Sequence, residues 1–291
     1  MSSINTNNSA MNALATLRGV NSNLNQTQDR ISTGLKVSSG KDNAAYFAIS
    51  ETMKGESGMN KAVNESLTLA KNSVSTARLG AETVQDLAQQ FVDRLAFAQN
   101  EGVDQESVQK ELTALASEMK TALDQSGFNG QNLLTTATPA RTEISFVSGV
   151  SRASDATLSL TSVTVNLTDL EALVGDPAAN AADDSTFADI QITNASTTAE
   201  LEASLSAAQG FLEDITAAAT DLGIGEKSLE NQQEFLTKLT DNLDTGVGAM
   251  VDANMEEEAA RLQALQVQQQ LASQSLSIAN QAPQNILSLF R

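Results

Sequence analysis

The sequence predicts a mainly α-helical fold, in which long N- and C-terminal helices form an elongated antiparallel coiled-coil rod with a small β-rich outer insertion. Three observations predict this fold. Apolar residues recur at alternating steps of three and four over long stretches on both sides of the chain's middle. Aromatic residues make up only 3% of the chain, with no Trp, which favours a thin seam of Leu, Ala and Val over a compact core. Residues 136–196 are instead rich in Thr, Val and Ile.

Both ends of the chain lack charge, although the chain as a whole carries a formal net charge of −19. Residues 1–17 and 262–290 contain no charged side chain, yet both segments keep helical hydrophobic spacing. A helix with an apolar seam and no charge lacks the polar surface that keeps a free helix in solution. We therefore expect these ends to be disordered in the monomer and to pack against each other and against other copies of the chain.

The first long helix is predicted over residues 44–99, because apolar residues keep coiled-coil spacing from Ala45 to Ala98. Asp42 is expected to cap its N-terminus, and Gly102 lies just past its end. A helix of this length would measure roughly 84 Å at 1.5 Å per residue, which no small globular domain needs.

A second helix is predicted after Asp104, ending at Ser126-Gly127, and a tight turn is predicted at Asn129-Gly130. The insertion that follows alternates between apolar and polar residues in three short runs, which indicates strands. These predicted strands cover residues 142–147, 157–167 and 189–193.

Helix is predicted again from residue 198, where Thr197 and Glu200 have the spacing of a capping box. Apolar residues then recur every seventh position from Leu201 to Met250, and the register continues through two glycines in the middle of the run. We predict one long helix that is ended by the glycines at 246 and 248. A last helix is predicted to start at a cap formed by Asn254 with Glu257 and to end at Pro283.

The domain organisation follows from this near-palindromic order of elements. An inner terminal-helix domain is predicted from residues 1–43 with 252–291, and a coiled-coil rod domain from 44–135 with 197–251. A variable, surface-exposed outer domain is predicted over residues 136–196.

The composition argues against catalysis and against several kinds of partner. The chain has no Cys and no His, which excludes cysteine nucleophiles, disulfides and His-based acid–base catalysis. Acidic clusters such as residues 183–184 and 256–258 are interpreted as a solvated loop and a helix N-terminus rather than as metal ligands. We expect no cofactor, no metal and no enzyme activity. The excess of acidic residues argues against nucleic acid as a partner. The chain contains no run of about 18 apolar residues, so we do not expect membrane insertion.

Several motifs at both ends of the chain resemble those of bacterial flagellins. Residues 4–7 read INTN, residues 30–37 read RISTGLKV, residues 128–130 read FNG and residues 280–291 read NQAPQNILSLFR. The resemblance covers about residues 1–135 and 198–291. It implies a structural subunit that is exported unfolded by the flagellar type III apparatus and polymerises into the extracellular flagellar filament used for swimming. It further implies an export chaperone, cap proteins and hook-junction proteins as partners.

The polymerisation interface is predicted from apolar seam positions in the two end segments. The predicted residues are Leu14, Leu17, Leu24, Ile31, Leu35, Leu262, Leu265, Leu276, Ile286, Leu289 and Phe290. Leu17→Glu or Leu276→Glu is expected to abolish filaments while the central rod stays folded.

Many family members carry an Arg in the long N-terminal helix that helps to engage an animal innate immune receptor. This chain has Phe91 at that position, which argues against recognition by that receptor. Two other functions stay open from the sequence. A hook–filament junction protein would share the terminal helices but stay at low copy number, and a secreted coiled-coil effector or adhesin would lack a helical lattice.

Overall fold

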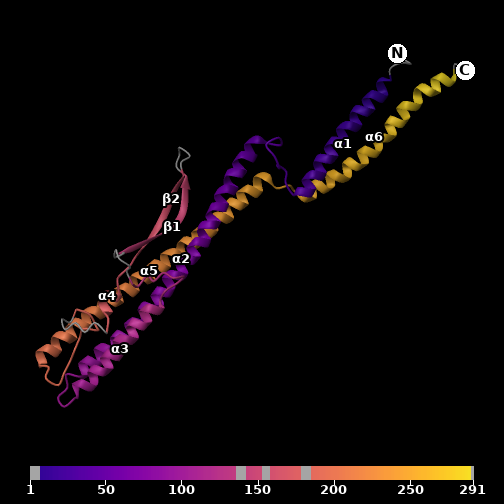
Figure 1. The fold of residues 1–291 in the computed structure, drawn as a ribbon. Helices are drawn as coiled ribbons and strands as arrows, with labels where there is room; N and C mark the ends of the chain where they lie inside the picture. The colour runs from indigo at the N-terminus through magenta and orange to yellow at the C-terminus, as the bar shows by residue number, and fades with distance from the viewer. Residues whose placement is uncertain (1–6, 136–141, 153–157, 178–184, 290–291) are drawn as a thin grey trace. The chain divides into compact units, whose positions relative to one another are not determined.

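The computed structural model describes residues 7–135, 142–152, 158–177 and 185–289. The described residues are mainly helical and contain a small two-stranded antiparallel sheet, as the sequence predicts (Figure 1). In chain order the elements are α1 Asn8–Thr33, α2 Ala44–Phe97, α3 Gln105–Gln125, β1 Glu143–Arg152, β2 Leu158–Asn166, α4 Glu171–Val174, α5 Thr198–Val251 and α6 Met255–Leu289.

The chain forms two compact units. The first, which we call the terminal unit, comprises residues 1–57 and 241–291, and the second, the bundle unit, comprises residues 58–240. The boundaries proposed for three domains from the sequence stay a prediction.

The bundle unit is organised by an antiparallel pairing of α2 with α5. Polar side chains link the two helices at intervals: Asn64 donates to Thr237, and Gln85 donates to Thr216. Further along, Gln99 donates to the Leu201 carbonyl. One hydrophobic core runs beneath these contacts and includes α3 and residues from the insertion. The uninterrupted helices α2 and α5 confirm the two long helices predicted from heptad spacing.

The insertion packs along the helices of the bundle unit. The hairpin of β1 and β2 contacts α5, because the Gln232 side chain donates to the Ser148 carbonyl at 2.8 Å. Phe187 lies edge-on between Phe91 of α2 and Phe211 of α5. The insertion thereby buries apolar side chains in the same core as the long helices.

The third predicted strand, residues 189–193, is wrong. This segment has no strand partner among the described residues; the Gln109 side chain of α3 binds it instead. Gln109 Oε1 accepts the Ile192 N–H at 2.8 Å, and Gln109 Nε2 donates to the Ile190 carbonyl at 3.3 Å. One amide side chain thus supplies the two hydrogen bonds that a neighbouring strand would give, while Ile190 and Ile192 are buried in the core.

The predicted helix caps are partly right. Thr197 and Glu200 form the expected capping box, with the Thr197 N–H donating to Glu200 and the Glu200 N–H donating to Thr197 Oγ1. Asn254 accepts the N–H groups of the first turn of α6. Asp42 does not cap α2: Asn43 does, by accepting the N–H groups of residues 45 and 46.

Asp42 is unavailable as a cap because it binds the two serines before it. Its carboxylate accepts the Ser38 and Ser39 N–H groups and both hydroxyls. These hydrogen bonds, led by the one from the Ser38 N–H, hold the pKa of Asp42 below its usual value.

Two predicted helix ends are also wrong. The helix α5 passes Gly246 and Gly248 and ends at Val251, because Val247 and Val251 are buried against Val37. This burial outweighs the cost of a helical glycine, about 1 kcal/mol each. The helix α6 likewise passes Pro283 and ends at Leu289. Proline removes only one main-chain hydrogen bond, and the Ala279 carbonyl that loses it accepts instead from Asn7, the N-cap residue of α1.

Candidate self-association surface on the terminal helices

In the terminal unit, α1 and α6 lie side by side and antiparallel (Figure 1). Their shared seam is apolar and thin. Val20 and Leu24 of α1 are buried against Leu265 of α6, with Leu262 partly buried beside them. A core of so few side chains stabilises the pair only weakly, since a fully buried aliphatic side chain contributes about 1.5–3 kcal/mol.

Polar contacts supplement this seam. In its middle, Gln269 Nε2 donates to Asn21 Oδ1 at 2.7 Å. At its inner end, Arg30 pairs with Glu258 at 3.1 Å, and Arg261 reaches the same carboxylate oxygen at 3.3 Å. Glu258 is only 5% exposed, so these two cations offset part of the cost of burying a carboxylate. The charged contacts therefore stand at the end of the pair that adjoins the connecting segments.

Two connecting segments, residues 34–43 between α1 and α2 and residues 252–254 between α5 and α6, lie together in the terminal unit. The first segment forms main-chain hydrogen bonds with the second and with the last residue of α5. The Lys36 N–H donates to the Val251 carbonyl at 2.6 Å, and the Ala253 N–H donates to the Gly34 carbonyl at 2.9 Å. Gly34 ends α1 in the left-handed conformation, with φ of 73°, which glycine adopts without strain. This main-chain contact joins the C-terminal end of α1 to the N-terminal end of α6.

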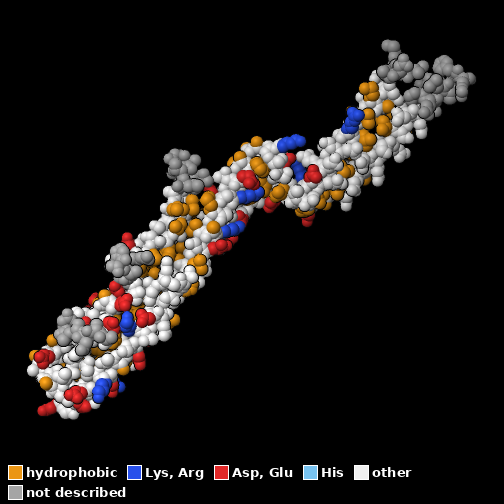
Figure 2. Space-filling view, viewed as in Figure 1, with side chains coloured by type: hydrophobic (Ala, Val, Ile, Leu, Met, Phe, Trp, Pro, Cys, Tyr) orange, Lys and Arg blue, Asp and Glu red, His pale blue; other side chains and the backbone are white. Residues whose placement is uncertain are grey.

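A second apolar stripe lies on α6, outside the seam that this helix shares with α1. Val267, Leu271 and Ile278 are 55%, 63% and 62% exposed. They are spaced four and seven residues apart, so they share one face of the helix. Met11 of α1 is similarly exposed. Hydrophobic side chains are visible at the surface of this helix pair in Figure 2. Exposed apolar side chains that recur along one face of a helix make this face a candidate interaction surface.

A shallow groove of about 310 Å³ runs between α1 and α6 beside this stripe. Its lining carries no charge and consists of Ala13, Thr16, Val20, Gln268, Leu271, Ala272 and Ser275. A neutral lining suits contact with an apolar helix that itself lacks charge.

The predicted interface residues fall mostly on the inner seam. Leu24 and Leu265 are buried in it, and Leu35 packs at the connecting segments. Leu17, Ile31, Leu262 and Leu276 are half-buried, whereas Leu14 is exposed. Ile286 and Leu289 lie in α6, but their side chains fall outside the described residues, as does Phe290 entirely. Whether these residues contact other copies stays a prediction.

Sequence reasoning missed the exposed stripe of Val267, Leu271 and Ile278. The heptad register runs through Leu262, Leu265 and Leu276 and leaves the three residues of the stripe outside it. The sequence does contain the signal, because two apolar stripes on the uncharged part of α6, residues 262–289, exceed what a single partner helix can cover.

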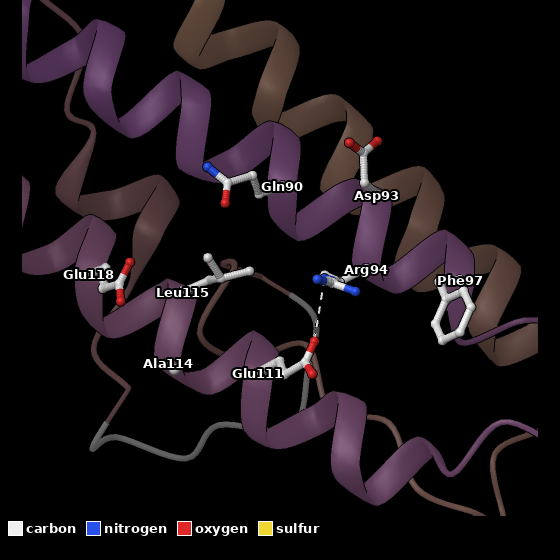
Figure 3. Close-up of a pocket in the computed structure, with 8 residues that line it drawn as sticks. All are labelled: Gln90, Asp93, Arg94, Phe97, Glu111, Ala114, Leu115 and Glu118. Atoms are coloured by element: carbon white, nitrogen blue, oxygen red, sulfur yellow. Dashed lines mark ion pairs between the residues drawn. The ribbon is translucent and has the colours of Figure 1, made fainter.

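The bundle unit carries a larger groove of about 600 Å³ between α2 and α3 (Figure 3). Arg94 of α2 and Glu111 of α3 form an ion pair across it at 3.3 Å, with both side chains 56% exposed. The remaining lining residues are Gln90, Asp93, Phe97, Ala114, Leu115 and Glu118. An exposed ion pair in an open groove contributes little to stability, and the lining offers no pairing of nucleophile and base.

In the described part of the chain, no group of three or more His, Cys, Asp or Glu residues is placed to hold a metal ion. Among the same residues, no helix is apolar enough over sufficient length to span a membrane.

Antiparallel helices from opposite ends of one chain, apolar on the seam and again on the outside, define a class of helical protein whose two ends pair with each other. Residues 4–138 match the bacterial flagellin N-terminal helical region, and residues 205–290 match the bacterial flagellin C-terminal helical region. The chain belongs to the flagellin family and is a structural subunit of the bacterial flagellar filament.

Relatives match over the whole length of the chain. It is 36% identical to flagellin C of Rhizobium meliloti (strain 1021) and 36% identical to the flagellin of Brucella melitensis biotype 1. Each comparison covers 100% of both proteins. Among solved structures, the flagellin of Bacillus cereus is 17% identical with a TM-score of 0.43, covering 59% of this chain and 88% of that one.

Proposed function

We propose that this flagellin polymerises through the terminal unit, with the outer stripe of α6 packing against the terminal helices of neighbouring copies. The observation that carries the proposal is the exposure of Val267, Leu271 and Ile278 on a helix whose other apolar face is already covered by α1. A head-to-tail contact that does not close on itself generates an open helical fibre. The filament core is thus assigned to residues 1–43 and 252–291.

The absence of charge at the ends supports this arrangement. In a helical polymer every copy packs near identical copies, so one Glu on the interface would be repeated at every subunit. Like charges brought together in a water-poor core repel strongly. The Gln and Ser side chains along residues 262–290 can hydrogen-bond to a neighbour or to water without that penalty.

A charge placed on the outer stripe tests the proposal. Leu271→Glu should prevent purified protein from elongating filament seeds, because the new carboxylate would be desolvated at each repeat. Leu160→Glu on β2 is the matched control, since Leu160 is 69% exposed and Leu271 is 63% exposed. We expect the control to elongate seeds normally. Electron microscopy and sedimentation measure both, and normal filaments from Leu271→Glu would refute the proposed surface.

The same measurement separates a filament subunit from a hook–filament junction protein. A junction protein should add to seeds without elongating them, whereas we expect continuous elongation from the wild-type chain. Leu17→Glu and Leu276→Glu at the half-buried seam should also abolish elongation, because they disrupt the α1–α6 pair that presents the outer stripe.

We further infer that the chain is exported unfolded by the flagellar type III apparatus with a chaperone, is added beneath the cap and adjoins the hook-junction proteins outside the cell. The thin α1–α6 seam supports this inference, because helices with so small a shared core order readily only when neighbours cover them. The absence of Cys is compatible with export as an extended chain.

Recognition by the innate immune receptor that engages an Arg in other family members is not expected. The corresponding Phe91 is fully buried and packs edge-on against Phe187, with ring centroids 5.0 Å apart. A receptor could reach this side chain only by displacing the insertion. Receptor activation by purified protein measures this, and a strong response would contradict it.

A further inference from the structure

The last part of α6 contains a carbonyl group that its own helix cannot satisfy. Pro283 lies inside α6, which continues to Leu289. Proline has no main-chain N–H, so the carbonyl four residues earlier loses its usual helical partner. That carbonyl belongs to Ala279, which is half-buried on the side of α6 that faces α1. A buried main-chain carbonyl without a partner is costly.

Asn7 of the other helix supplies the missing partner. Its Nδ2 donates to the Ala279 carbonyl at 2.8 Å. The other end of the same side chain caps α1, because Asn7 Oδ1 accepts the Ala10 N–H at 3.0 Å. One amide therefore closes the first turn of α1 and fills the gap that proline leaves in α6. A Ser in its place could still cap the helix, but its shorter side chain would not reach α6.

The position of this contact matters because the apolar seam of the pair defines register poorly. The cluster of Val20, Leu24 and Leu265 is small, and Gln and Ser fill much of the remaining surface. A slip of one helical turn would cost little apolar burial. Two polar contacts, Asn21 with Gln269 and Arg30 with Glu258, lie in the middle of the pair and near the connecting segments. The contact of Asn7 with Ala279 lies at the opposite end of the pair, at the start of α1. Only in the observed register does an amide donor meet the unpaired carbonyl.

We propose that Asn7 is a positioning residue which fixes the register of α1 against α6 through the carbonyl that Pro283 leaves unpaired. The proline thus marks the register, because it leaves an unpaired acceptor in the interior of α6, away from the carbonyls of the last turn that every helix leaves unpaired. The outer apolar stripe of α6 is presented correctly to other copies only when this register is kept. This inference rests on the proposed packing of the terminal unit in the filament.

The test is a double-mutant cycle on seeded elongation by the full-length chain. Asn7→Ser keeps the cap and removes the donor, and should raise the critical concentration for elongation roughly two- to tenfold, the worth of one hydrogen bond. Pro283→Ala restores the main-chain N–H at this position, so the Ala279 carbonyl is satisfied within α6. Adding Asn7→Ser to Pro283→Ala should therefore change the critical concentration less than about twofold.

Asn21→Ser is the matched control, because it removes another amide contact from the same helix pair. Its effect should be equal in the wild-type background and in the Pro283→Ala background. Thermal unfolding followed by circular dichroism verifies that the bundle unit is intact in every variant. If Asn7→Ser elongates like wild type, or if its effect is the same in both backgrounds, the register proposal is overturned. Failure of the wild-type chain itself to elongate seeds would instead overturn the proposed packing.

Discussion

Two glycines two positions apart in α5 have quite different surroundings. A Cβ added at Gly225 would lie 2.5 Å and 2.8 Å from the two methyl carbons of Val165 on β2. A Cβ added at Gly223 would meet only the Arg78 side chain, at an ordinary 3.8 Å. Gly225 thus lets the hairpin approach the long helix closely, whereas nothing in the structure requires Gly223 to lack a side chain.

This difference predicts opposite effects of one substitution at the two sites. Gly225→Ala should lower the free energy of unfolding of the bundle unit by about 1–3 kcal/mol, because the methyl group overpacks the contact with Val165. Gly223→Ala should raise it by about 1 kcal/mol through helix propensity alone. Chemical denaturation measures both. Val165→Ala should reduce the cost of Gly225→Ala, and equal effects of the two alanines would contradict the assigned role of Gly225.

At the scale of elements, heptad spacing and capping chemistry predict the long helices well, because both signals are local in sequence. The capping box at Thr197 and the cap at Asn254 are examples. Asp42 is a local exception, because it binds Ser38 and Ser39 instead of capping α2. The other wrong predictions concern residues whose partners are distant. Residues 189–193 resemble a strand, but the amide of Gln109 takes the place of a neighbouring strand. Pro283 resembles a helix end, but Asn7 satisfies the carbonyl that it frees. No local pattern reveals either partner.

The capping box at the start of α5 makes the stability of this helix depend on pH. The Thr197 N–H and hydroxyl donate to the Glu200 carboxylate, and these bonds lower the pKa of Glu200 in the folded state. A lowered pKa stabilises the fold above the unfolded-state value and loses that contribution as pH falls through the folded-state value. Wild type should therefore unfold at a higher temperature than Glu200→Gln at pH 7.

This advantage should shrink as pH falls below the ordinary range of a Glu, because Gln keeps the size of the side chain but does not titrate. Thermal unfolding between about pH 7 and 3 follows the difference across the ordinary Glu pKa of about 4.3. Glu202→Gln, one turn into the same helix and outside the cap, serves as the control and should show a smaller pH-dependent difference. A constant gap between wild type and Glu200→Gln at all pH values would contradict the assigned role of Glu200.

For the whole molecule, the sequence identifies the segments that associate but not the face that they present. The uncharged ends point to α1 and α6 directly. Their pairing, however, covers the heptad positions such as Leu24 and Leu265, and leaves Leu271 and its neighbours outside. One apolar stripe of α6 is buried within the chain and the other remains exposed for other copies. Which stripe is buried depends on the pairing of α6 with α1, a segment more than two hundred residues away in the sequence. Spacing within either segment alone does not decide it.

The charged residues of the chain lie outside its two uncharged ends, and this distribution predicts how salt concentration changes filament assembly. The subunits carry a net charge of −19 outside the uncharged segments, so neighbouring copies repel each other while their ends attract by apolar contact. The Debye length falls from about 30 Å at 0.01 M salt to about 8 Å at 0.15 M. The critical concentration for seeded elongation should therefore fall as salt is added, because the repulsion between copies is screened.

Two kinds of variant separate apolar contact from charge. Leu271→Ala should raise the critical concentration at every salt level without changing its salt dependence, because it removes apolar contact only. Gln263→Glu, which places a carboxylate on α6, should steepen the salt dependence, and Gln263→Ala controls for loss of the amide. If Gln263→Glu and Gln263→Ala respond to salt alike, a charge on this part of α6 does not affect assembly, and repulsion between copies does not explain why residues 262–290 lack charge.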